Sequence, residues 1–137
     1  MTVPVPEVLP HVDAVEAALA LSALTIYVGG TPTDSGWKRP DKYAVLYPDP
    51  GMALRESLAD KRTDFVLTFQ VTCVGSSVER VLWVADRVRR ALAVPLTVAG
   101  RACWRAEELG GPPVDRDDDV TPPAWFLPVQ YRLQSTS

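Results

Sequence analysis

The residue types that could carry out catalysis are few and scattered. His11 is the only histidine in the chain of 137 residues, and without a flanking motif we expect it at the surface or as a helix cap, not as a general base. The serines fall in caps, loops and the C-terminal tail, and none lies in a G-x-S-x-G pattern. Gly29-Gly30-Thr31-Pro32 lacks the lysine and helix that follow in a phosphate-binding loop. The sequence therefore predicts no catalytic residue, no cofactor and no enzymatic activity.

The best candidate for metal binding is the acidic run from Asp115 to Asp119, because clustered carboxylates suit hard cations such as calcium. The run lacks the central glycine and the closing glutamate of a calcium loop, so we interpret it as a solvated acidic loop. Cys73 falls in register with a buried strand face, and Cys103 is expected to be half exposed. Neither cysteine belongs to a C-x-x-C motif or a Cys/His cluster, so no metal site is predicted.

Composition limits the class of protein. A length of 137 residues, 47% of them hydrophobic, fits one domain spanning residues 1–137. The net charge of −3 makes nucleic acid a poor partner. No apolar run approaches the roughly 20 residues that cross a bilayer, and the N-terminus lacks the features of a signal peptide. We therefore expect no membrane association and a protein that stays in the cytoplasm of the cell that makes it.

The residues before position 50 predict one helix and two strands. Apolar residues recur at helical spacing from Pro10 to Ala23, and proline fits the first turn of a helix. Thr25–Val28 and Tyr43–Tyr47 are rich in β-branched and aromatic residues, which favours strands. The segment from Thr31 to Asp41 contains two prolines and a glycine, so we expect a loop there.

A long strand followed by a helix is predicted between Arg62 and Leu92. From Phe65 to Cys73 every second residue is apolar, which indicates a strand with one buried face. Ser76 and Glu79 have the spacing of a capping box, and a helix is expected over Ser77–Ala93. Its predicted buried stripe consists of Val78, Val81, Leu82, Ala85, Val88 and Leu92.

The opposite side of that helix carries the sharpest candidate for a binding surface. Trp83 falls there among Arg80, Arg87 and Arg90, with Asp86 spaced to pair with Arg90. An exposed tryptophan ringed by arginines is typical of a protein-protein hot spot. The alternative is that Trp83 lies flat under its own arginine side chains through cation-π contact.

Two long connections and a closing strand complete the pattern. The connection between Tyr47 and Phe65 is long enough to reach a neighbouring molecule, and its candidate contact residues are Arg55, Glu56, Asp60, Lys61 and Arg62. The sequence predicts a hairpin around Gly100 and a solvated loop over Glu107–Pro123. The last strand alternates from Trp125 to Leu133, and Pro128 within it indicates an edge position or pairing on one side only.

These elements together predict an α+β fold. We expect a two-layer sandwich in which two helices cover one face of a mostly antiparallel sheet of five to six strands.

The motifs of this chain resemble the tail terminator and tail completion proteins of long-tailed, siphovirus-type phages of actinobacteria. The resemblance rests on the Asp60–Gly75 and Ser77–Leu92 segments, on Tyr43–Pro50 and on the closing strand Trp125–Leu133. It spans most of the chain after about residue 24. The resemblance implies a structural virion subunit, made in the host cytoplasm, that acts without catalysis. Its partners would be other copies of itself in a ring, typically a hexamer, the tail tube protein, and the head-tail connector or neck protein.

Two alternatives to a tail terminator stay open. The first is a neck or head-closure protein or another minor virion component. The second, of another class, is a small cytoplasmic metal-binding or enzyme domain that uses the acidic loop. The virion alternatives require an oligomer or a docking partner, whereas the last requires a ligand or turnover.

Overall fold

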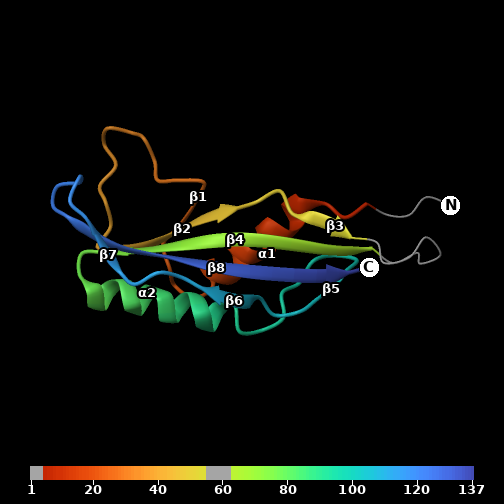
Figure 1. Ribbon diagram of the computed structural model, residues 1–137. Helices are drawn as coiled ribbons and strands as arrows, with labels where there is room; N and C mark the ends of the chain where they lie inside the picture. The colour runs from red at the N-terminus through yellow and green to blue at the C-terminus, as the bar shows by residue number, and fades with distance from the viewer. Residues whose placement is uncertain (1–4, 55–62) are drawn as a thin grey trace.

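The computed structural model describes residues 5–54 and 63–137 (Figure 1). These residues form two helices and eight strands. In chain order they are α1 (Val8–Ala20), β1 (Ile26–Val28), β2 (Lys42–Pro48), β3 (Met52–Leu54), β4 (Asp64–Gly75), α2 (Val78–Ala91), β5 (Ala102–Cys103), β6 (Glu107–Gly110), β7 (Asp115–Asp117) and β8 (Ala124–Thr136).

The sheet is built around the two longest strands, β4 and β8. They pair antiparallel from Asp64 opposite Thr136 to Gly75 opposite Trp125. On one side β4 pairs with β2 and β3, and β1 joins β2 as a parallel strand. On the other side the short strands β5, β6 and β7 pair in turn along β8. The sheet is therefore mostly antiparallel, as predicted.

Both helices pack on one face of this sheet. The alternating residues of β4 that were predicted to be buried, such as Leu67 and Phe69, lie in one hydrophobic core with Val15 of α1 and Val88 of α2. The ring of Phe69 stacks on Tyr131 of β8, with centroids 5.6 Å apart. The two-layer α+β sandwich is confirmed, and Figure 1 shows α2 running along one side of the sheet.

The other face of the sheet is covered at one end by a second, smaller core. Tyr43, Val45 and Val74 are buried there beneath Trp37, which belongs to the loop between β1 and β2. The indole N–H of Trp37 donates to the Tyr27 hydroxyl over 3.1 Å, and the three aromatic rings meet edge to face. In Figure 1 this loop rises from the sheet on the side away from α2.

The prediction of five to six strands was too low. The segment over Glu107–Pro123, expected to be a solvated loop, contributes β6 and β7, which both pair with β8. The described part of the Tyr47–Phe65 connection contributes β3, which pairs with β4. The charged side chains of β6 and β7 gave no apolar alternation, and β3 is only three residues long, so none of the three has the pattern of a strand. A strand at the rim needs only its backbone groups to be bonded.

Pro128 shows how the rim of the sheet is arranged. It lies opposite Thr72 of β4 on one side of β8. On the other side β6 ends opposite Gln130 and β7 begins opposite Phe126, so Pro128 occupies the interval between them. The expectation of one-sided pairing is confirmed, although β8 itself lies inside the sheet. Gly111 crosses this interval so closely that an added Cβ would come within 2.1 Å of the Pro128 carbonyl oxygen.

The ends of several elements differ from the prediction. Helix α1 begins at Val8, which places Pro10 in its first turn, and the chain leaves the helical conformation before Ala23, where φ is 60°. The cap of α2 is Ser77, not Ser76, because the Ser77 hydroxyl accepts the Arg80 backbone N–H. The expected hairpin around Gly100 is reduced to a single bridge between Val98 and Arg101, and the residues after it join β8.

The buried stripe of α2 is rotated from the predicted one. Val78 and Leu82 are exposed, whereas Val84 is fully buried. Because α2 contacts α1 as well as β2, β4 and β8, its buried arc follows these neighbours and not the centre of its apolar residues. No helix in the described residues is long and apolar enough to cross a membrane.

Candidate interaction surfaces

Trp83 is half buried, not exposed as predicted. Its ring packs against the edge of the main core. The Lys42 ammonium lies over the ring at 3.7 Å from the centroid, and the Arg87 guanidinium lies over it at 4.7 Å. The geometry matches the cation-π alternative in that Arg87 covers the ring. It adds Lys42 from β2, which no pattern in the sequence indicated. Such contacts are each worth about 0.5–2 kcal/mol.

Arg80 is held within its own chain. Its Nε lies 2.5 Å from an Asp41 carboxylate oxygen, and its Nη1 donates to the Ser76 hydroxyl over 3.1 Å. The Ser76 hydroxyl in turn donates to Asp41 over 2.6 Å. This exposed cluster ties the start of α2 to the residue before β2, and it neutralises the charge of Arg80.

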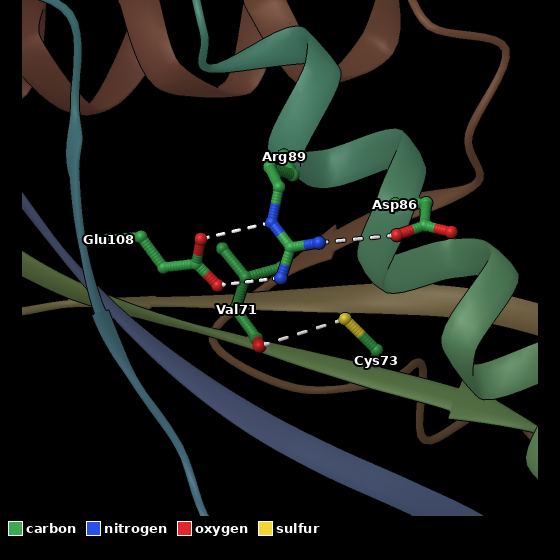
Figure 2. Close-up of polar contacts among 5 residues, drawn as sticks. All are labelled: Val71, Cys73, Asp86, Arg89 and Glu108. Atoms are coloured by element: carbon green, nitrogen blue, oxygen red, sulfur yellow. Dashed lines mark hydrogen bonds and ion pairs between the residues drawn. The ribbon is translucent and has the colours of Figure 1, made fainter.

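Arg89, not Arg90, forms the ion pairs at the C-terminal half of α2. Figure 2 shows its guanidinium between Glu108 of β6 and Asp86 of its own helix. Nε and Nη2 donate to the two Glu108 carboxylate oxygens over 3.0 and 2.9 Å, and Nη1 lies 3.3 Å from Asp86. The Arg89 guanidinium lowers the pKa of Glu108, and this hydrogen bond raises the pKa of Arg89. The predicted Asp86–Arg90 pair is wrong. Asp86 pairs with Arg89, one turn along the same helix, and Arg89 also pairs with Glu108 of β6.

A shallow groove lies beside this ion pair, between α2 and the β6 side of the sheet. Leu82, Ala85, Leu127 and Tyr131 line it together with the Arg89–Glu108 pair. Burial raises the pKa of the Tyr131 hydroxyl, which keeps this phenol neutral. The groove is lined by both polar and apolar side chains, and Asp86, Arg89 and Glu108 are paired with one another.

The other half of the predicted contact surface cannot be placed. Arg55, Glu56, Asp60, Lys61 and Arg62 lie outside the described residues. Before them, the Asp49 carboxylate accepts the Gly51 and Thr68 backbone N–H groups over 2.8 and 3.3 Å. Asp49 therefore fixes the turn that leads from β2 into β3.

Carboxylates of the acidic run between Asp115 and Asp119 form contacts with other residues of the same run. Arg116 lies 2.6 Å from Asp118, and the Asp117 carboxylate accepts the Asp119 backbone N–H over 3.0 Å. No group of three or more His, Cys, Asp or Glu side chains that would suit a metal ion occurs within residues 5–54 and 63–137.

His11 is fully buried, so the expectation of a surface or cap residue was wrong. Its Nδ1–H donates to the Glu7 carbonyl over 2.6 Å, which leaves Nε2 to accept the Ser135 hydroxyl over 2.7 Å. The ring lies 4.4 Å from that of Phe65. Burial is the main cause that lowers the pKa of His11, and the nearby Arg101 charge acts in the same direction, against the hydrogen bond to Glu7.

Arg101 completes this polar network. Its Nε donates to the Ser135 hydroxyl over 2.8 Å, and its Nη2 donates to the Thr63 carbonyl over 2.6 Å. A serine hydrogen-bonded to a histidine is the arrangement of a hydrolase nucleophile. Here Ser135 has no exposed surface and a backbone carbonyl orients His11, so the serine hydroxyl is not presented to solvent. The network joins α1, β4, β8 and the Gly100 turn, and its role is structural.

Comparison with known proteins identifies the fold. No family model matches the sequence, and no curated protein matches it. A chain from a solved structure of the virion of a native gene transfer agent particle superimposes with a TM-score of 0.62 at 15% identity, over 91% of this chain and 93% of that chain. The two chains share one fold. A second solved chain, named only by a sequence identifier, gives a TM-score of 0.51 at 17% identity over 92% of this chain and 93% of its own.

The residues that sequence reasoning missed share one property. Lys42, Glu108, Arg101 and Ser135 each act on a partner that is distant in the sequence, and none lies in a recognisable motif. A polar residue in register with the buried face of a strand was the one available signal. Ser135 continues the alternation of Val129, Tyr131 and Leu133, and such a residue must find a buried hydrogen-bond partner.

Proposed function

We propose that this chain is a structural virion protein that forms a ring, hexameric in its complete form, which caps a phage-type tail tube and joins it to the head connector. The observation that carries the proposal is the likeness in fold to a chain of a gene transfer agent virion, which extends over nearly the whole length of both chains. The resemblance of the β4–α2 and β8 segments to tail terminator proteins supports the same function.

The surface chemistry supports an assembly role. The described residues contain a groove lined by both polar and apolar side chains. Helix α2 also carries the half-buried Trp83 beside Arg87 and Arg90, and tryptophan and arginine are the residue types that contribute most to protein-protein contacts. A closed ring of identical subunits needs two different complementary patches on each subunit. We propose the Trp83 face as one of these patches.

The experiment is to measure the assembled mass and the binding to tail tubes. The purified chain, with a mass of 15.0 kDa, is analysed by light scattering after size exclusion, alone and after incubation with purified tail tubes. We expect a hexamer on the tubes, and electron microscopy of virions with the labelled subunit should show the label at the head-proximal end of the tail. A chain that stays monomeric at high concentration and binds no tube end contradicts the proposal, and label on the connector alone indicates a neck protein instead.

A further inference from the structure

The outward face of α1 is acidic and lacks any basic residue. Leu9, Asp13, Glu16 and Ala20 follow one another at intervals that place them on one side of a helix. All four are exposed, and Leu9 retains 64% of its surface. The helix from Val8 to Ala20 contains no lysine or arginine, so this face presents two carboxylates beside an exposed leucine.

The outward face of α2 has the opposite charge near its C-terminal end. Arg80 and Arg89 are neutralised by Asp41 and Glu108. Among the ion pairs formed within the described residues, none involves Arg87 or Arg90. The net positive charge of this helix is therefore concentrated in Arg87 and Arg90, next to Trp83.

These two faces cannot each bind a copy of itself. Two α1 faces would bring carboxylates together, and two α2 faces would bring guanidinium groups together, and like charges in contact cost several kcal/mol. Each face complements the other in charge, and each carries an apolar side chain beside its charges: Leu9 on α1 is exposed, and Trp83 on α2 is half buried. Both helices contribute residues to the same hydrophobic core of the subunit.

We infer that the outward face of α1 in one copy of this chain binds the outward face of α2 in the next copy. The contact is heterologous, which is the kind that propagates around a ring. This inference rests on the proposed ring and adds its subunit contact: Asp13 and Glu16 of one subunit pair with Arg87 and Arg90 of its neighbour.

Charge reversal provides the test. Variant A carries Asp13→Arg and Glu16→Arg, and variant B carries Arg87→Glu and Arg90→Glu. Each alone brings like charges together in every contact, so we expect the dissociation constant of self-assembly to rise by about 10-fold or more. Asp34→Arg, an exposed reversal in the loop between β1 and β2, is the control and should leave assembly unchanged. Circular dichroism and the melting temperature of each variant establish that it is folded.

Mixing the variants provides the decisive measurement. In an equimolar mixture the basic α2 of A meets the acidic α1 of B, and the acidic α2 of B meets the basic α1 of A, so assemblies that alternate A and B should form again. Native mass spectrometry should show equal numbers of the two subunits. Raising the salt concentration should weaken the wild-type contact, since the faces are exposed.

The possible outcomes separate this inference from the proposed function. If the wild-type chain assembles on tail tubes and folded A and B assemble equally well, the inference is overturned and the ring stands. If A and B are folded and lose assembly but their mixture does not recover it, the α1–α2 pairing is overturned. If the wild-type chain does not assemble even on tail tubes, both the ring and this contact are overturned.

Discussion

Arg101 is the residue whose removal tests the buried polar network most directly. It donates to Ser135, which has no exposed surface, and to Thr63, which is 7% exposed. The substitution Arg101→Ala removes four hydrogen bonds at once, two to each partner. Arg101→Lys keeps the charge but cannot reproduce the planar set of donors.

The expected loss of stability follows from the two shortest of these contacts. The bonds from Nε to the Ser135 hydroxyl and from Nη2 to the Thr63 carbonyl are 2.8 and 2.6 Å long. A hydrogen bond that involves a charged group contributes about 1.5–3 kcal/mol. Arg101 is only half buried, and the Ser137 N–H also donates to the Thr63 carbonyl, so part of the loss is offset. We expect a decrease in the free energy of unfolding of about 2–4 kcal/mol for Arg101→Ala, with a smaller decrease for Arg101→Lys.

Urea unfolding followed by tryptophan fluorescence measures this effect. With a slope of about 1–3 kcal/mol per molar urea, the midpoint should fall by about 1–2 M. Arg105→Ala is the matched control, since Arg105 is exposed and only a few residues away, and it should change stability by less than about 0.5 kcal/mol. All chains are compared at a concentration at which light scattering gives them the same mass. Equal midpoints for Arg101→Ala and Arg105→Ala would refute the assignment of the network as a structural element.

Three further predictions concern single side chains. Because the folded state lowers the pKa of His11 below 6.5, the unfolded chain binds more protons, so the free energy of unfolding of the wild type should fall as the pH drops below 6.5. The variant His11→Gln should show a smaller fall. Parallel plots of stability against pH for the two chains from pH 7.5 to 5.5 would contradict this prediction. Ser77→Ala should cost about 0.5–2 kcal/mol in thermal or urea unfolding as a lost helix cap, and Ser76→Ala should cost less; the reverse order would restore Ser76 as the cap. Burial raises the pKa of Cys73 to about 12, so iodoacetamide at pH 8 should alkylate Cys103 in the native protein and spare Cys73, whereas equal rates would show that Cys73 is accessible.

The fold class was predictable because its main signals are local. The alternation from Phe65 to Cys73 and from Trp125 to Leu133 marks two long strands whatever they pair with, and both were found, each extended by a few residues. The helices were found for the same reason. The short strands β6 and β7 were missed because their own residues show no apolar alternation. They become strands because their backbone groups pair with the side of β8 that faces away from β4.

The candidate site was predictable only as a list of residue types. The helical period placed Trp83 and the arginines of α2 on one outward side, but it could not show that Asp41 and Glu108 neutralise two of those arginines, or that Lys42 lies over Trp83. Those partners come from other elements of the fold. The net charge that a helix face presents to a partner depends on which of its charged residues pair with other elements of the same chain. It is therefore known only after those elements have packed together.

The local patterns of the sequence were enough to predict an α+β fold, and they contain no recognisable catalytic or metal-binding motif, because backbone periodicity and side-chain chemistry are properties of short segments. The tertiary structure alone decided that His11 lies in the interior, where Ser135, 124 residues away in the chain, provides its hydrogen bond. It also decided which arginines of α2 pair with carboxylates of other elements. Burial and electrostatic pairing depend on distance in space, and that distance is fixed only when α1 packs against the sheet that contains β8.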